Sequence, residues 1–386
     1  MKEWIVEGDA CERGFLGSFA SAAAGEGRGQ VAWALRYDDE EGRRASAAIP
    51  YSPFMAKPIE EADLPELNRS LIAHVADIVK LWKDGSSEGK EVAPLRQDPL
   101  RAGRLRWDGA TFVLEVGADT ELLIVGDLHG CYNNLIAILE QSDFCARVEG
   151  GEDVFLVFLG DFFDRGLRTI EGILPTLFAL IEKYPGRVLP LQGNHELVLP
   201  ARGGGIQPYS SPSDTWDFWA GHLSAEALGA LGQFFNKAVP LMLFCSNGVV
   251  VSHAGIPDDD FVAGMKGVED FARLEGLRAL SPTALNILWT DPAEGPFYRI
   301  RNPIHAPFGT RQFDTFMGKV GATLLVRGHE AKADGVEFTY PGRLVTVFSA
   351  GGALNPDAGG SYPRVRPRYL RIRGRELVAC AIKWDS

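Results

Sequence analysis

Short apolar segments that end in a glycine and a polar side chain recur through the last two thirds of the chain. The first two are followed by stretches of helical periodicity, so strands and helices are expected to alternate. The segments are 122–125 with Gly126-Asp127, 154–159 with Gly160-Asp161, and 187–191 with Gly193-Asn194. In open α/β sheets, ligands bind beyond the carboxyl ends of the strands. The sequence therefore predicts the α/β (α+β) class, with polar side chains gathered at one edge of a sheet.

Five short motifs in this region carry residue types that bind divalent metal ions. They are Gly126-Asp127-Leu128-His129-Gly130, Gly160-Asp161-Phe162-Phe163-Asp164-Arg165-Gly166, Gly193-Asn194-His195-Glu196, Ser252-His253-Ala254-Gly255 and Arg327-Gly328-His329. Hard divalent ions prefer carboxylate, imidazole and amide oxygen ligands. A carboxylate shared between two ions holds them roughly 3.5–4 Å apart and lets both polarise one water, which then attacks phosphorus. The motifs thus predict metal-assisted hydrolysis of a phosphate ester.

The motifs resemble the phosphoprotein phosphatase branch of the calcineurin-like metallophosphoesterases. The resemblance covers residues 120 to 350, and the segment Leu288-Trp289-Thr290-Asp291-Pro292 is similar to a Trp-Ser-Asp-Pro segment of that family. It implies a central β-sandwich flanked by helices. It also implies two metal ions, with manganese favoured and iron or zinc possible. By the same resemblance, Asp127 and His129 would hold the first ion, Asp161 would bridge, and Asn194, His253 and His329 would hold the second.

The resemblance further implies residues for proton transfer and phosphate binding. His195 would be the general acid, oriented by Asp164, and Arg165 would bind phosphate oxygens through its planar guanidinium. A second phosphate-binding arginine is expected near a family-like Phe-Gly pair. Arg301 is the first candidate for it, and Arg299 is the second.

The segment Phe348-Ser349-Ala350-Gly351-Gly352 begins like the Phe-Ser-Ala-Pro-Asn-Tyr-Cys loop of that family and then diverges. The Tyr and Cys expected there are missing. This departure leaves the substrate open: it is either phosphoserine and phosphothreonine, or phosphotyrosine. One hypothesis is that the divergent loop leaves a deeper pocket, which would favour phosphotyrosine. Pro190 is a second irregularity, because proline in a central strand removes a hydrogen bond of the sheet.

We expect a metal-dependent phosphoprotein phosphatase that cleaves phosphomonoesters by direct attack of a metal-bridging hydroxide, with a phosphoprotein or phosphopeptide as substrate. The alternative in the same family is a hydrolase of dinucleoside polyphosphates or nucleotides, since such relatives share the ligands. An alternative of another class is a non-catalytic phosphate-binding scaffold.

Composition bears on partners and compartment. The net charge is -12, whereas nucleic-acid binders usually carry a basic field, so nucleic acid is not expected as a partner. No stretch approaches the ~20 apolar residues that span a bilayer, and the N-terminal residues do not make a signal peptide. The five cysteines form no CxxC pair, which favours a reducing compartment. We therefore expect a cytoplasmic protein without membrane contact; the oligomeric state is left open.

The chain is expected to divide into an N-terminal accessory module, 1–118, and a catalytic domain, 119–386. Further expected elements, in chain order, are a hairpin of 31–37 with 43–49, a helix over 64–83, a hairpin over 105–113 around Asp108-Gly109, a helix after 154–159 that Pro175 kinks or divides, and a C-terminal hairpin of 369–373 with 377–382.

Overall fold

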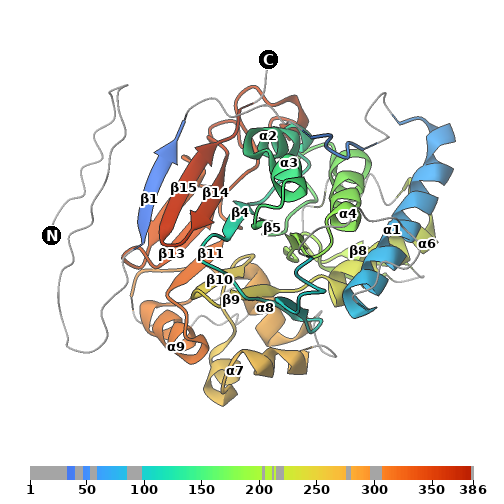
Figure 1. The fold of residues 1–386 in the computed structure, drawn as a ribbon. Helices are drawn as coiled ribbons and strands as arrows, with labels where there is room; N and C mark the ends of the chain where they lie inside the picture. Colours follow the sequence, from blue (N-terminus) through green and yellow to red (C-terminus); the bar gives the residue numbers. More distant parts are fainter. Residues whose placement is uncertain are drawn as a thin grey trace, which may run out of the picture.

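The computed structural model describes residues 33–39, 47–52, 59–84, 98–201, 205–210, 213, 221–274, 280–295 and 307–383. Two mixed β-sheets form the centre of this part of the chain (Figure 1). The first has the strand order β1 (Ala34–Asp38), β15 (Glu376–Ala381), β14 (Arg368–Arg373), β4 (Glu121–Val125), β5 (Val154–Phe158) and β6 (Val188–Pro190). The second has the order β12 (Val336–Thr339), β13 (Leu344–Val347), β11 (Leu324–Arg327), β10 (Val249–Ser252), β9 (Met242–Cys245), β3 (Thr111–Leu114) and β2 (Leu105–Trp107).

Helices cover the outer face of each sheet (Figure 1). On the first sheet lie α2 (Tyr132–Ser142), α3 (Phe144–Glu149) and α4 (Leu174–Lys183), and beyond α4 lie α1 (Leu64–Asp84) and α6 (Ala225–Gln233). On the second lie α7 (Asp259–Gly264), α8 (Pro282–Trp289) and α9 (Thr310–Val320). Outside the two sheets, β7 (Val198–Pro200) pairs with β8 (Ile206–Pro208). Within the described residues, no helix is long and apolar enough to cross a lipid bilayer.

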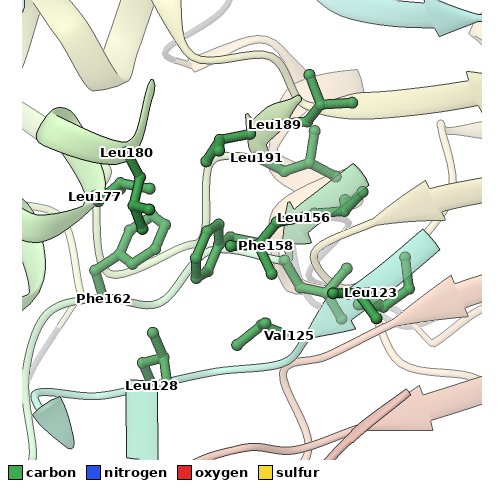
Figure 2. Packing of buried hydrophobic residues seen from close by; sticks show 14 of the residues in the cluster. Leu123, Val125, Leu128, Leu156, Phe158, Phe162, Leu177, Leu180, Leu189 and Leu191 are labelled. Atoms are coloured by element: carbon green, nitrogen blue, oxygen red, sulfur yellow. The ribbon is translucent and has the colours of Figure 1, made fainter. Parts of the chain in front are cut away.

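The core confirms that the sheets pack face to face as a sandwich. Successive side chains of a strand point to opposite faces. In β10, Val249 and Val251 belong to the core shared with the first sheet, whereas Val250 belongs to the core beneath α7, α8 and α9. Figure 2 shows part of the buried cluster, in which Leu177 and Leu180 of α4 lie beside Phe162, and leucine and phenylalanine side chains of β4 and β5 continue the packing. Both faces of the central strands, such as β4, β5, β10 and β11, are therefore buried, which explains their continuous apolar runs.

The strand directions bring the loops of the motifs together. In the first sheet, β4, β5 and β6 run parallel to one another. In the second, β10, β11 and β13 also run parallel. An isolated bridge between Asp127 and Phe348, which follow β4 and β13, joins the two sheets at this edge. The predicted edge with gathered polar side chains is thus present.

Several expected elements are confirmed: the helix over 64–83, the hairpin of β2 with β3, and the C-terminal hairpin of β14 with β15. Pro175 divides its helix as predicted. The π-helical turn η3 (Thr169–Ile173) comes first, and Pro175 lies in the first turn of α4, where the helix changes from one type to the other.

Two expectations about strands are corrected. The strand β1 lies parallel to β15 at the edge of the first described sheet. Of its expected hairpin partner, 47–49 is not a strand, and 43–46 lie outside the described residues. Pro190 does not interrupt a central strand, because β6 is the edge strand of the described sheet and Pro190 is its last residue. An edge position tolerates a residue that cannot donate a hydrogen bond.

The described part of residues 1–118 contributes to both sheets. The strand β1 extends the first sheet, β3 pairs with β9 in the second, and α1 packs against α4 and α6. The division of the chain at residue 118 stays a prediction about the role of this part.

An ion-pair cluster fixes the start of β5 and predicts how stability depends on pH. Burial raises the pKa of Asp153, but hydrogen bonds from Arg104, Thr120 and Arg187 outweigh it and hold this pKa at about 2, below the ordinary 3.8. Arg104 Nη2 and Arg187 Nη1 lie 2.9 and 2.6 Å from the carboxylate oxygens. The depressed pKa contributes stability that is present above pH 4 and lost as the pH falls towards 2, about 2 kcal/mol in all.

Asp153→Asn is therefore expected to lower the free energy of unfolding at pH 7 by at least about 2 kcal/mol, because the buried Arg187 also loses its partner. The free energy of unfolding of the variant should also change less with pH between pH 4 and 2. Urea unfolding at pH 7, 4 and 3 measures both effects. If the free energy of unfolding falls with decreasing pH as steeply in the variant as in the unmodified protein, other carboxylates cause the acid sensitivity.

Candidate metal centre

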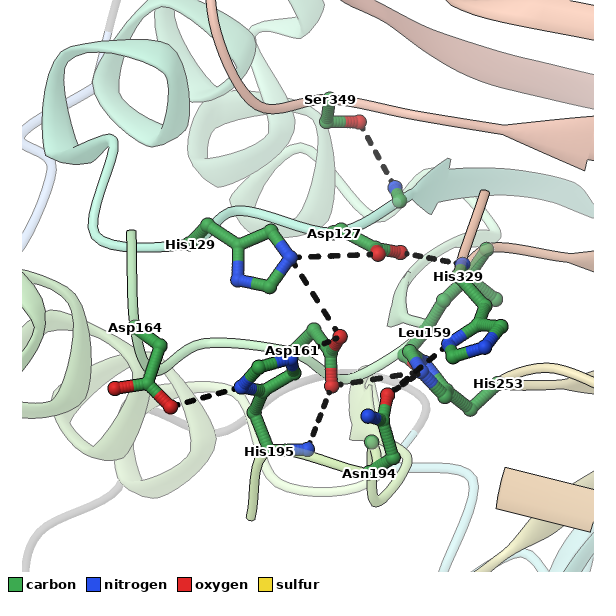
Figure 3. Close-up of polar contacts among 12 residues, drawn as sticks. Asp127, His129, Leu159, Asp161, Asp164, Asn194, His195, His253, His329 and Ser349 are labelled. Carbon is green, nitrogen blue, oxygen red and sulfur yellow. Dashed lines mark hydrogen bonds and ion pairs between the residues drawn. The ribbon is translucent and has the colours of Figure 1, made fainter. Parts of the chain in front are cut away.

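Five side chains that follow parallel strands converge at the common edge of the two sheets (Figure 3). Asp127, Asp161 and Asn194 follow β4, β5 and β6 of the first sheet, and His253 and His329 follow β10 and β11 of the second. Asp127, Asp161, Asn194 and His253 are almost completely buried. The folding of two separate sheets is thus needed to assemble one site.

The first group of donor atoms comprises side chains of Asp127, His129 and Asp161. His129 Nδ1 lies 2.7 Å from the carbonyl oxygen of Phe163, so it donates its proton there and Nε2 keeps a lone pair. Nε2 lies 3.8 Å from Asp127 Oδ2 and 3.6 Å from Asp161 Oδ2. Among the described residues, the buried Asp127 Oδ2 has no hydrogen-bond partner. Three buried acceptors that face one another repel unless a cation lies between them.

The second group comprises side chains of Asp161, Asn194, His253 and His329. His253 Nδ1 lies 2.9 Å from the carbonyl oxygen of Leu159 and donates to it, which leaves a lone pair on Nε2. Asn194 Oδ1 lies 2.8 Å from this Nε2 and 3.1 Å from His329 Nδ1, and Asp161 Oδ1 lies 3.4 Å from the same Nε2. The amide oxygen therefore faces acceptors rather than donors. This arrangement also fits a cation bound between the side chains.

Asp161 belongs to both groups. Its Oδ2 faces the first group and its Oδ1 faces the second. The six ligand candidates from the sequence are thus together, and one carboxylate lies between two sets of donor atoms.

The electrostatics of the site also fit bound cations. Burial raises the pKa of Asp127 to about 7, and burial followed by the charge of Asp127 raises the pKa of Asp161. Burial lowers the pKa of His129 and His253, which keeps these imidazoles neutral. Neutral imidazoles are metal ligands, and a divalent ion among the carboxylates would favour their ionised form.

His195 lies beside the first group, and its Nδ1 contacts Asp164 Oδ2 at 2.8 Å. Its backbone N–H donates to Asp161 Oδ1 at 3.0 Å. Because the carboxylate occupies Nδ1, Nε2 is the ring nitrogen left for another group, and it lies 3.9 Å from Asp161 Oδ2. His195, Asp164 and the ligand candidates are therefore neighbours, as the sequence predicts.

The arginines of the motifs have different surroundings. Arg165 is half-buried and follows Asp164 in a strained turn, where both residues have positive φ angles of 70° and 65°. Arg327 is completely buried, and its guanidinium pairs with Asp291 and Glu330, both at 2.5 Å. Arg327 is thus a structural residue that links its motif to the Trp-Thr-Asp-Pro segment. Arg301 and Arg299 lie outside the described residues.

Glu196 is a residue of the site to which sequence reasoning gave no role, although it stands in the Gly-Asn-His-Glu motif. Its carboxylate is buried and accepts backbone N–H groups of Asp161, Phe162, Phe163 and Gly193 at 2.8 to 3.2 Å. It thereby joins the turns that carry Asp161 and Asn194.

Backbone strain is concentrated at this site. Among the described residues, eight other than glycine have a positive φ angle, and six of these belong to the site or contact it: His129, Asp161, Asp164, Arg165, His329 and Tyr362. Such conformations cost on the order of 1–3 kcal/mol each and cluster where function needs a fixed geometry.

Comparisons with known proteins agree with this geometry. The family described as calcineurin-like phosphoesterase matches residues 120–333. A probable serine/threonine-protein phosphatase of Encephalitozoon cuniculi is 28% identical over 261 residues, which are 67% of this chain and 53% of that protein. The catalytic subunit of serine/threonine-protein phosphatase 4 of Saccharomyces cerevisiae is 27% identical, with 60% of this chain and 70% of that protein covered. Serine/threonine-protein phosphatase 5 of Homo sapiens is 28% identical, with 69% and 49% covered.

The chain thus spans about half the length of the first and third of these relatives. Among solved structures, a protein serine/threonine phosphatase from Saccharomyces cerevisiae with similarity to human phosphatase PP5 superposes with a TM-score of 0.58 at 18% identity. The superposition covers 86% of this chain and 92% of that one. At this identity the likeness concerns the fold alone.

Proposed function

The chain belongs to the calcineurin-like phosphoesterase family, and we propose that it is a metal-dependent phosphoprotein phosphatase that hydrolyses phosphomonoesters on serine, threonine or tyrosine side chains. The observation that carries this proposal is the position of Asp161 between two groups of donor atoms. The names of the relatives, all serine/threonine-protein phosphatases, support a phosphoprotein as substrate.

Two divalent ions are proposed as cofactors. Asp127, His129 and Asp161 would hold the first, and Asp161, Asn194, His253 and His329 would hold the second. Carboxylate, imidazole and amide oxygen ligands suit manganese, which we expect, and they also suit iron and zinc. Bound at these positions, the ions would supply hydroxide near neutral pH and neutralise charge on the phosphoryl group.

The remaining polar side chains have proposed roles in binding and proton transfer. Arg165 would bind phosphate oxygens, and Arg301, or Arg299, would be the second phosphate-binding arginine. His195 would donate a proton from Nε2 to the leaving alkoxide, while Asp164 keeps the imidazole in place through the 2.8 Å contact with Nδ1. We also propose a reducing compartment such as the cytoplasm, which is supported by four buried cysteines without disulfides among the described residues.

His195→Asn is expected to keep the metal content and to slow alkyl phosphates far more than aryl phosphates. A phenolate leaves without a proton, whereas a serine alkoxide needs one, and general acid catalysis contributes typically 10²–10⁴-fold. The ratio of kcat/KM for phosphoserine peptide to that for p-nitrophenyl phosphate measures the effect. Equal slowing of both substrates would argue against the proton-transfer role.

The function is tested by substrate competition with purified, manganese-loaded protein. Matched phosphotyrosine, phosphoserine and phosphothreonine peptides are compared with a diadenosine polyphosphate in the same assay. Fast peptide turnover that a chelator abolishes supports the proposal and ranks the three residues. Fast nucleotide cleavage with slow peptide turnover would transfer the function to nucleotide hydrolysis, and no turnover of any phosphate ester would favour a scaffold.

A further inference from the structure

A buried serine on the loop after β8 contacts the imidazole of His195. Ser210 Oγ lies 3.3 Å from Nδ1 of His195. The carboxylate of Asp164 lies 2.8 Å from the same nitrogen (Figure 3). Residues 205–209 of this segment are half-buried or exposed, whereas Ser210 is buried, as His195 is. The segment thus turns one polar side chain inwards, and that side chain meets the imidazole.

The tautomer of His195 defines the direction of this hydrogen bond. A carboxylate accepts hydrogen bonds, so the imidazole carries a proton on Nδ1 and directs it towards Asp164. The hydroxyl oxygen of Ser210 then accepts the second, longer branch of a three-centre hydrogen bond from the same N–H. Nδ1 keeps its proton whether or not Nε2 carries one, so the contact with Ser210 persists when Nε2 gives its proton away.

Two acceptors at Nδ1 fix the imidazole better than one. A single hydrogen bond allows small changes of χ1 and χ2 that turn the ring and move Nε2. The oxygen of Ser210 restricts these changes at Nδ1. The ring of His129 lies edge-on to the imidazole, with centroids 5.0 Å apart and planes at 88°. Together these contacts hold the direction in which Nε2 of His195 points.

The loop that carries Ser210 is itself attached to the site. The N–H of Tyr209 donates to the carbonyl oxygen of Leu197, directly after the Gly-Asn-His-Glu motif, at 2.8 Å. The ring of Tyr209 meets that of Trp289 edge-on at 5.9 Å, and Trp289 meets His329 edge-on at 6.0 Å. The position of the serine is therefore set by contacts with two of the motifs that form the site.

We propose that Ser210 is a positioning residue that fixes the imidazole of His195 for proton transfer to the leaving group of a phosphomonoester. The inference rests on the proposed function, in which Nε2 of His195 donates that proton. It assigns a role to a segment that lies between the Gly-Asn-His-Glu motif and α6 and that belongs to none of the five motifs.

Ser210→Ala tests the proposal, because it removes the hydroxyl and keeps the backbone. We expect kcat for a phosphoserine peptide to fall roughly threefold to tenfold, the effect of one hydrogen bond, with KM unchanged. Hydrolysis of p-nitrophenyl phosphate should change little, because its phenolate leaves without a proton. The metal content should be that of the unmodified protein. Equal slowing of both substrates, or a rise in KM alone, would overturn the proposal.

A double-mutant cycle tests whether the hydroxyl acts through His195. In the His195→Asn background, Ser210→Ala is expected to slow the phosphopeptide no further, because the imidazole that it orients is gone. An undiminished effect of Ser210→Ala in that background would contradict positioning of His195.

Ser142→Ala is the matched control, since it also removes a buried hydroxyl, at the C-terminal end of α2 and outside the site. Its kcat and KM for both substrates should equal those of the unmodified protein. A loss as large as that in Ser210→Ala would show that the effect is not specific, and would overturn the proposal.

A measurement without turnover separates this inference from the proposed function. In zinc-loaded protein, which is diamagnetic, the Nδ1–H proton of His195 is identified in the proton NMR spectrum by its absence from His195→Asn. Ser210→Ala should shift this resonance, and Ser142→Ala should not. If the resonance shifts but no phosphate ester is hydrolysed, the proposed function fails and the positioning of the imidazole stands. If phosphopeptides are hydrolysed but Ser210→Ala changes neither the resonance nor kcat, the positioning role fails and the proposed function stands.

Discussion

Asp161→Asn is expected to lower turnover on the order of a thousandfold and to reduce the bound metal from two ions per chain to one or none. Each oxygen of Asp161 faces one group of donor atoms. An amide offers one oxygen without a negative charge, so it cannot serve both groups. A thousandfold loss corresponds to about 4 kcal/mol of transition-state stabilisation, which is the range expected for charge neutralisation by metal ions.

The measurement combines the metal-to-protein ratio from mass spectrometry with kcat/KM for p-nitrophenyl phosphate. Asp314→Asn is the matched control, because the same chemical change then falls on an exposed carboxylate of α9 that pairs with Arg343. The control should retain its metals and activity. An Asp161→Asn protein that is fully metallated and fully active would exclude the shared-carboxylate arrangement.

The positions of the candidate ligands could be predicted because the information is local. Each ligand follows a short apolar strand within a few residues, and parallel strands deliver such residues to one edge. The sequence therefore indicates which residues belong to the site. It does not indicate which atoms face each other; the unpartnered Asp127 Oδ2 and the amide oxygen of Asn194 towards His253 are visible only in three dimensions.

Strand order was harder to predict, since it depends on contacts between distant segments. The strand β1 pairs with β15, more than 300 residues further along the chain, and no local pattern in 34–38 distinguishes that partner from a hairpin partner. Pro190 signals only that its strand is not central in the sheet. That β6 ends the described sheet follows from the pairing of β5 with β6 and from the place of both in the strand order.

Roles that depend on contacts with the backbone also cannot be predicted from the sequence. The carboxylate of Glu196 accepts hydrogen bonds from the N–H groups of residues 161 to 163, and the sequence next to Glu196 does not indicate these partners. Tyr362 reaches His129 through a loop whose path depends on Gly351 and Gly352. In both cases the side chain is ordinary and the geometry is set by residues far away in the chain.

The second large effect is expected from a single methyl group, in Gly193→Ala. A Cβ atom at Gly193 would lie 2.2 Å from both the backbone nitrogen and Oδ1 of Asp161, and 2.6 Å from Glu196 Oε2. No methyl group fits at these distances, so the turn that carries Asn194 must move away from Asp161. The movement separates donor atoms of the second group and breaks hydrogen bonds to Glu196.

Gly193→Ala is therefore expected to destabilise the fold by about 3 kcal/mol and to lower the metal content and turnover as Asp161→Asn does. Gly229→Ala is the control, because a Cβ atom there, within α6, meets no atom within 4 Å. In a helix this change stabilises by roughly 0.5–1 kcal/mol.

Urea unfolding of both variants, with and without chelator, compares the two glycines. The steric argument requires that Gly193→Ala lowers the free energy of unfolding and that Gly229→Ala raises it. Similar unfolding curves for the two variants would therefore refute the close approach between Gly193 and Asp161. If the loss of stability persists in the presence of chelator, the close approach itself holds the two turns together. If it disappears, the glycine matters only for binding the metal.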